Sequence, residues 1–240
     1  STTVRANLPL TSGLLTSTGS NLVSLGTAAA VSGASPASYV NGNLQKVFLT
    51  GVQSFSFPIG DTASFTPLVV AFANVSSSGN VTASTTPGQH PNIATSAINP
   101  ARDVNRSWTL IPAGGLAYSS YNATFNFVAA DVIGGADPSD FIVQRYSAGW
   151  TSPTLGARTA TSTQATALTA MGSFAIGEPL SMATSTLIAC LPDPVSMPSS
   201  AACTATVTAV IPGNTPSGTV SLVSSGAGLF TPADTCSLSG

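Results

Sequence analysis

Charged side chains are scarce in this chain. Of its 240 residues, six are Lys or Arg and eight are Asp or Glu, which is 6% of the total. An ordinary soluble domain carries roughly 25%. The net charge of −2 and the lack of a basic stripe argue against nucleic-acid binding. Because catalysis and metal binding also depend on charged groups, we predict that the chain is not an enzyme and uses no cofactor.

Histidine and long apolar runs are also rare. The single histidine, His90, lies in a loop by composition, and a general base needs an orienting partner, so we interpret it as a loop side chain. No apolar stretch approaches the roughly 20 residues of a membrane helix, which predicts no membrane insertion. The first residues lack the regions of a signal peptide. We interpret the chain as a mature form or as a segment of a longer protein.

Glycine, proline and β-forming residues are plentiful instead. The chain contains 22 Gly and 17 Pro, and 43% of its residues are hydrophobic, so we expect a packed core with frequent turns. Segments rich in Val, Ile, Phe, Thr and Tyr lie between the turns, as strands require. We predict strands at residues 46–50, 54–57, 67–73, 80–85, 107–111, 122–129 and 141–146. This pattern predicts an all-β fold with a β-sandwich body; residues 164–171 are a weak helical candidate.

Composition divides the chain into four regions. Residues 1–38 consist of short strand–turn steps that resemble the last rungs of a β-solenoid, which stack on neighbouring rungs. Residues 39–178 form the predicted sandwich. Residues 179–200 contain prolines and serines and are predicted to be a linker, and residues 201–240 carry a new alternating pattern.

Several ordered phrases resemble a known family. Residues 38–178 contain SYVNGNLQK, FPIGD, NRSWTL, YNATFNFV, FIVQRY and SFAIGE, and residues 11–29 contain TSGLLT and LVSLGTAA. Together they resemble a β-sandwich module of very large secreted and cell-surface proteins of Bacteroidetes-type bacteria. The resemblance implies a scaffold or adhesin outside the cell, and it assigns no catalytic residue.

The last 40 residues are similar to bacterial Ig-like repeats, in which a cysteine-flanked strand, a PSGTV turn and a GxFxP loop recur. A complete Ig sandwich needs about seven strands and roughly 100 residues, so we predict a partial Ig-like unit. A disulfide between Cys203 and Cys236 would tie this unit together and contribute roughly 3–4 kcal/mol. Cys190 would then be free, or would form a bridge between molecules.

Two groups of polar residues allow a functional and a structural interpretation. Asp131, Asp137 and Asp140 surround a glycine-containing turn, where carboxylates bind Ca²⁺ or simply stabilise the turn. Their spacing matches no EF-hand loop, which favours the turn.

The other group precedes the first tryptophan. Arg102, Asp103 and Arg106 are expected to form a partly buried Arg–Asp pair or to stack an arginine on Trp108. The functional alternative is a sugar-binding platform built from the aromatic residues Trp108, Trp150, Tyr118 and Tyr121.

The sequence therefore predicts a non-enzymatic extracellular structural protein, either a filament subunit or an adhesin stalk. Residues 1–38 contain one charge, Arg5, and residues 201–240 contain one, Asp234, so the ends of two copies repel each other little. We expect a homo-polymer in which residues 1–30 of one copy add strands to the next copy. The alternatives are a carbohydrate-binding adhesin module of a larger surface protein and, less favoured, a secreted hydrolase, which needs paired carboxylates in a cleft.

Overall fold

The computed structural model describes residues 1–180, 184–191, 200–209, 216, 218–223 and 235–238. It divides the chain into two compact units, Ser1–Leu180 and Ser181–Gly240. The predicted all-β fold is confirmed, because the described residues form strands and three short 3-10 helices, η1 (Ile93–Thr95), η2 (Ala129–Asp131) and η3 (Pro138–Asp140). No helix within these ranges is long and apolar enough to cross a bilayer.

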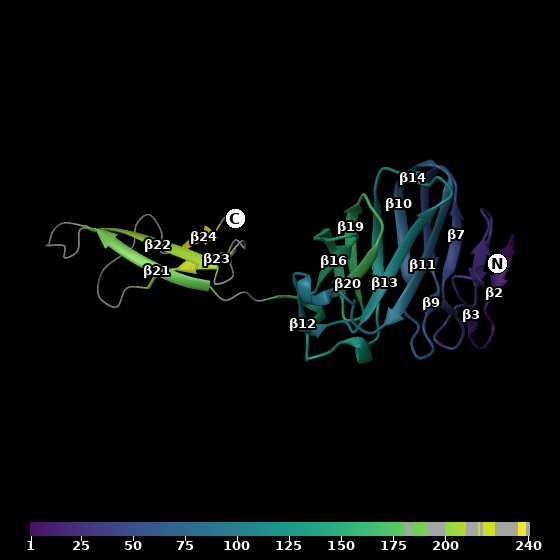
Figure 1. Cartoon of the computed structure of the whole chain (residues 1–240), viewed down its shortest axis with the longest axis horizontal. Helices are drawn as coiled ribbons and strands as arrows, with labels where there is room; N and C mark the ends of the chain where they lie inside the picture. Colours follow the sequence, from purple (N-terminus) through teal and green to yellow (C-terminus); the bar gives the residue numbers. More distant parts are fainter. Residues whose placement is uncertain (181–183, 192–199, 210–215, 217, 224–234, 239–240) are drawn as a thin grey trace. The chain divides into compact units, whose positions relative to one another are not determined.

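The larger unit is built on two sheets (Figure 1). The first contains, in spatial order, β1 (Thr2–Val4), β4 (Val23–Leu25), β7 (Leu44–Phe48), β11 (Gly79–Pro87), β13 (Arg106–Ala113), β20 (Ser173–Pro179), β16 (Ile142–Tyr146) and β17 (Trp150–Thr151), with β12 (Ile98–Asp103) paired to β20. The second contains β14 (Ala117–Tyr118), β10 (Leu68–Ser77), β15 (Tyr121–Asn126), β19 (Ser162–Leu168) and β18 (Thr154–Thr159), with β8 (Gly51–Phe57) paired to β10. All seven predicted strands are present, with ends shifted by a few residues.

The weak helical candidate at residues 164–171 was wrong. Strand β19 occupies most of it and pairs with both β15 and β18. Thr163, Ala165 and Leu168 are buried on one face of this strand. Pairing on both sides, together with β-branched threonines that suit a strand, overrides the weak helical preference of the segment.

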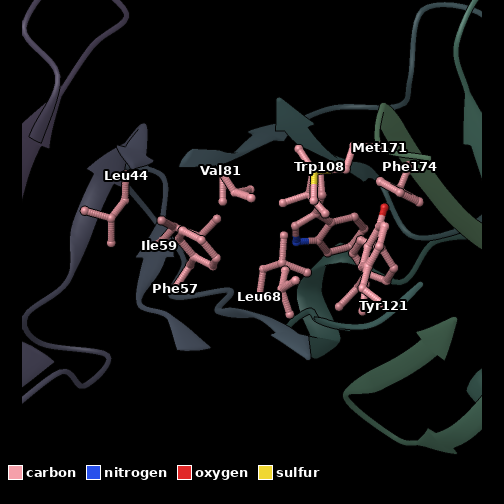
Figure 2. Close-up of a cluster of buried hydrophobic side chains, with 14 of the residues drawn as sticks. Leu44, Phe57, Ile59, Leu68, Val81, Trp108, Tyr121, Met171 and Phe174 are labelled. Carbon is pink, nitrogen blue, oxygen red and sulfur yellow. The ribbon is translucent and has the colours of Figure 1, made fainter. Parts of the chain in front are cut away.

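One hydrophobic core lies between the two sheets. Trp108 is fully buried and its ring packs against Phe125, with ring centroids 5.4 Å apart. Figure 2 shows the core running from Leu44 and Ile59 to Trp108 and Phe174. The alternation of apolar and polar residues along the strands therefore matches their burial, since one face of each sheet supplies the core and the other face is more exposed.

Short parallel strands make up the first 42 residues. Thr2 pairs with Val23, and Val23 pairs with Leu44, so successive turns of chain are displaced by 21 residues. Two further parallel ladders run beside this one, formed by β2 (Asn7–Pro9) with β5 (Ala30–Ser32) and by β3 (Leu15–Ser17) with β6 (Val40–Gly42) and β9 (Ile59–Gly60). We call residues 1–17 the first coil and residues 23–42 the second coil.

The coils continue directly into the sandwich. Strand β7 pairs in parallel with β4 of the second coil and antiparallel with β11 of the sandwich, and Figure 1 shows the coils, in purple, beside β7. Leu25 and Val40 belong to the same hydrophobic core as the sandwich residues. The boundary expected at residue 38 therefore lies inside one compact unit.

Gly42 in the YVNGNL phrase is required by the close approach of the two coils. Its φ is +110°, and a Cβ atom there would lie 2.0 Å from the carbonyl oxygen of Ser17 in the first coil. Any other side chain would both strain the backbone and push the coils apart.

Lys46, the single lysine of the chain, links β7 to the second coil through hydrogen bonds. It is buried, and its ammonium group donates hydrogen bonds to the carbonyl oxygens of Gly26, Thr27 and Ala29 at 2.6, 2.9 and 3.0 Å. Burial lowers the pKa of this lysine. Because those carbonyls belong to the turn after β4, the ammonium holds the turn against the sandwich.

Replacing Lys46 by methionine is expected to lower the free energy of unfolding by about 2 kcal/mol, because carbonyl groups that are partly shielded from water lose their donor. The aliphatic stem is retained, so little packing is lost. Urea unfolding of Lys46→Met and of Arg5→Met, which removes an exposed cation from the first coil, tests this. Equal losses in the two variants would contradict the anchoring role of Lys46.

The described residues of the smaller unit form two antiparallel strand pairs. Strand β21 (Thr184–Leu191) pairs with β22 (Ala202–Ala209), and β23 (Gly218–Ser221) pairs with β24 (Thr235–Leu238). The linker expected at residues 179–200 is therefore partly wrong, because β21 occupies its middle. Residues 192–199 lie outside the described residues.

The predicted disulfide between Cys203 and Cys236 was also wrong. Cys190 and Cys203 face each other across β21 and β22, with Cα atoms 4.0 Å apart, and they are joined by a disulfide. Cys236 lies on β24 with an exposed free thiol. The cross-strand register decides the pairing, because directly opposed side chains are within reach of a disulfide. Cys190 is consequently not free to bridge two molecules.

Candidate functional site

Among the residues that the structure describes, no strand pairs with the outer edge of the first coil. Strands β1, β2 and β3 each have one neighbouring strand there, and that neighbour belongs to the second coil. A parallel ladder that ends in this way presents a row of unpaired backbone N–H and C=O groups. We call this row the open edge.

Side chains that point into the coils become less buried toward the open edge. Leu44 is fully buried and Val23 nearly so, whereas Thr2, their partner in the first coil, is exposed. Val40 and Ile59 are also buried, but Leu15 at the equivalent position of the first coil is only half-buried.

The interior of the coils therefore opens at this end into a cavity of about 430 Å³. Val4, Leu8 and Leu15 are half-buried and contribute to its lining, together with Thr2 and Val23. This cavity is the uncovered end of the hydrophobic core, because the same three apolar side chains pack against the core from the outside.

The hydrogen bonds of β1 show which of its groups face outward. The Thr2 N–H donates to the Leu22 carbonyl and the Val4 carbonyl accepts from the Gly26 N–H. Since backbone groups alternate in direction along a strand, the N–H and C=O of Thr3 point away from β4. In β3 the Leu15 N–H donates to Tyr39, so the groups of Thr16 point outward by the same rule.

Proline weakens the middle of the open edge. Pro9 lies in β2 between Leu8 and Leu10, and the Leu10 N–H is bonded to Ser32 of the second coil. Of the two outward positions in β2, Asn7 keeps its N–H donor, whereas Pro9 has none. The row of outward donors is therefore interrupted at Pro9.

Strand β21 of the smaller unit exposes apolar side chains. Leu187, Ile188 and Leu191 have relative exposures of 69%, 54% and 75%. Within the described residues the β21–β22 hairpin pairs with no other strand. A two-stranded hairpin of this kind is marginally stable by itself and gains from further pairing.

Residues 1–30 are paired within their own chain. Strand β1 joins β4, and β2 joins β5, so the predicted donor segment is part of the coils. To donate strands to another copy it would first have to leave these ladders.

His90 lies in a loop, as predicted, and its side chain is buried there. Its ring lies 4.8 Å from the Trp150 ring and 5.0 Å from the Tyr146 ring, and its Nδ1 accepts the Asn92 N–H. Burial lowers the pKa of His90. The cluster fixes the turn around η1, since Trp150 also donates its indole N–H to the Asn92 carbonyl.

The three aspartates considered for calcium do not act together. Asp131 forms a two-point ion pair with Arg106, and Asp137 accepts the Ser139 N–H at the start of η3. In the part of the chain that the structure describes, no group of three or more metal-binding side chains occurs. The turn interpretation accounts for Asp137.

The expected Arg–Asp pair is made with different partners. Arg106 is 1% exposed and binds Asp131 and Asp61, at 2.8 and 2.6 Å. Arg102 binds Glu178 through two nitrogens. Asp103 has no arginine partner: Gln89 donates to its Oδ2 at 2.8 Å, and its buried Oδ1 has no hydrogen-bond partner.

The four aromatic residues considered for sugar stacking do not form one surface. Trp108 and Tyr121 are buried in the core, and Tyr121 donates its hydroxyl hydrogen to the Ala170 carbonyl. Tyr118 packs on Tyr121, whereas Trp150 lies in the His90 cluster. The platform hypothesis was therefore wrong for this set of residues.

Comparison of the chain with protein-family models, with curated proteins and with solved structures finds no match. The functional argument consequently depends on the geometry above. Sequence reasoning missed two partners of the arginine ion pairs, namely Asp61, which binds Arg106, and Glu178, which binds Arg102. Each lies at the end of a quoted phrase, FPIGD and SFAIGE, and an isolated acidic residue in so uncharged a chain was the available signal.

Proposed function

We propose that the chain is an extracellular structural module that joins copies of itself by β-strand addition, as a filament subunit or an adhesin stalk. The open edge of the first coil is the acceptor, and the exposed β21–β22 hairpin of a second copy is the donor. The observation that carries the proposal is the half-buried set Val4, Leu8 and Leu15, which an added strand would cover.

Chemical complementarity supports this pairing. The acceptor is lined by apolar and hydroxyl side chains, and the donor exposes Leu187, Ile188 and Leu191. Arg5 is the one charged residue in the two coils, and strands β21 and β22 contain none, so association removes few charges from water. A contact between different surfaces that does not close into a ring produces a filament.

An extracellular location is supported by the disulfide between Cys190 and Cys203, because such bonds persist in oxidising compartments. The resemblance to modules of bacterial surface proteins agrees with this location. A structural role also agrees with the placement of three buried charges, since Arg106, Asp61 and Asp131 form ion pairs inside the sandwich.

Replacing Thr3 by proline tests the acceptor. Proline removes the outward N–H of β1 and leaves the hydrogen bonds of Thr2 and Val4 to the second coil in place. We expect wild-type protein to form polymers that sediment and are visible by electron microscopy, and Thr3→Pro to remain monomeric at the same concentration.

Thr3→Val is the matched control, because it keeps the N–H and should polymerise like wild type. Thermal unfolding of both variants checks that the coils remain folded. Equal polymerisation of Thr3→Pro and Thr3→Val would exclude β1 as the acceptor, and a wild-type protein that stays monomeric at high concentration would exclude the homo-polymer.

A further inference from the structure

A polar groove, separate from the cavity at the open edge, lies in the larger unit beside strands β17 and β18. Its volume is about 290 Å³. Five hydroxyl side chains and one arginine contribute to the lining: Arg145, Thr151, Ser152, Thr154, Thr166 and Thr169. None of these residues belongs to the open edge or to the buried ion pairs.

Arg145 is the one charged residue of the groove. It is half-buried on β16, and Nη1 donates to the Met171 carbonyl at 3.1 Å. Among the described residues no carboxylate lies within ion-pairing distance of its guanidinium, whereas Arg102 and Arg106 are both paired with acids. Arg145 therefore retains donors for an external anion, and a guanidinium suits a carboxylate best because two parallel hydrogen bonds form.

Hydroxyl groups surround this cation. The side chains of Thr154 and Thr169 are exposed and form no hydrogen bond with the described residues, and the Ser152 hydroxyl accepts from Gln144 Nε2. Hydroxyls that both donate and accept suit a ligand that is itself rich in hydroxyl groups. A purely apolar ligand would leave them without partners.

The wall of the groove has an unusual backbone. Ala167 has a φ of +54°, which is rare for a residue with a Cβ atom. It lies in a β-bulge, because Thr166 and Ala167 together oppose Asn122, and the Asn122 side chain accepts the Ala167 N–H at 3.0 Å. Strained residues and bulges are concentrated at binding sites, where they direct neighbouring groups toward a ligand.

The geometry points to a binding site for a saccharide that carries a carboxylate, with Arg145 binding the carboxylate and the threonine and serine hydroxyls binding the sugar hydroxyls. The groove volume is at the small end for ligand sites, which fits one sugar unit. This site is separate from the open edge, so it adds recognition of an acidic glycan to the structural role.

Titration of the full-length Thr3→Pro variant, which is expected to remain monomeric, with glucuronate, glucose and inorganic sulfate, followed by NMR of backbone amides, tests the site. We expect glucuronate to bind at least about tenfold more tightly than glucose, because the charge-assisted hydrogen bonds between its carboxylate and Arg145 should increase the affinity by about this factor. Sulfate, which lacks the sugar hydroxyls, should bind more weakly than glucuronate. The largest shifts should fall on the groove residues.

Arg145→Gln should remove the preference for glucuronate over glucose, and Arg145→Lys should retain part of it. Arg158→Gln is the matched control: Arg158 is an exposed arginine on β18 that does not line the groove. Equal binding of glucuronate and glucose, an equal loss in Arg158→Gln, or sulfate binding as tight as that of glucuronate would each overturn the assignment. Polymerisation should be unaffected by Arg145→Gln, so this test is independent of the open edge.

Discussion

Replacing Arg106 by methionine should destabilise the larger unit by about 3–5 kcal/mol, because two buried carboxylates lose their common partner. Arg106 is 1% exposed, and its guanidinium donates to Asp131 through Nε and Nη2 and to Asp61 through Nη1. Thr85 accepts a further hydrogen bond. Chemical denaturation of the purified variant measures the loss.

The pKa of Asp61 shows how strongly this network holds its charge. Burial by itself raises the pKa of Asp61, but the N–H groups of Ala63 and Ser64 and the Arg106 guanidinium bring it below its ordinary value. A depressed pKa means that the charged carboxylate stabilises the fold at neutral pH. This contribution is lost as the pH falls through the folded pKa of Asp61.

Two controls separate the buried charges from the loss of a side chain. Arg102→Met removes an arginine that also binds a carboxylate but is partly exposed. It should lower the free energy of unfolding clearly less than Arg106→Met does. Adding Asp61→Asn and Asp131→Asn to Arg106→Met should recover part of the lost stability, since the unpaired charges disappear. No recovery in the triple variant would show that packing, and not charge, accounts for the effect.

Replacing Asp103 by asparagine should have the second largest effect, and it should depend on pH. Asp103 is 1% exposed, and burial raises its pKa to about 6, although the hydrogen bond from Gln89 acts in the opposite direction. The folded protein therefore binds a proton more readily than the unfolded chain between about pH 4 and pH 6. Stability must fall as the pH rises through this range.

The expected size follows from the shift. A difference of about two pKa units corresponds to about 3 kcal/mol at roughly 1.4 kcal/mol per unit. The free energy of unfolding of Asp103→Asn, measured relative to wild type, should therefore increase by about 2 kcal/mol between pH 4 and pH 7, because the remainder of the change falls below pH 4. Parallel stability curves for the two proteins would contradict the assignment, as would a carboxyl carbon of Asp103 that titrates near pH 4 by NMR.

The strands and the sandwich could be predicted because they depend on local patterns. Residues 122–129 alternate apolar and polar side chains, and the structure buries Phe125 and Phe127 as this pattern requires. The core position of Trp108 follows from the same rule. Residues 164–171 and the linker predicted at residues 179–200 misled the prediction, since pairing with neighbouring strands is not a local property.

The partners of the charged residues could not be predicted. Arg106 binds Asp61 and Asp131, which lie 45 and 25 residues away, while Asp103 three residues before it remains unpaired by any arginine. Sequence proximity favoured the wrong partner. Successive side chains of a strand point to opposite faces of the sheet, so residues close in sequence can lie on different faces. Pairing between strands then brings residues that are distant in sequence together.

The cysteines show the same division between local and tertiary information. Their spacing was compatible with either Cys190 or Cys236 as the partner of Cys203. The register of β21 against β22 places Cys190 opposite Cys203. Register depends on the pairing of whole strands, which no single cysteine spacing encodes.

The sequence alone determined that the chain is a charge-poor, strand-rich protein with a core, because composition and alternation are sums over local positions. The tertiary structure decided where the few charges meet, that residues 1–30 stack on their own sandwich, and that the first coil ends in an open edge. The scarcity of charge at that edge matters only once the fold has placed unpaired strand groups and half-buried Val4, Leu8 and Leu15 beside one another.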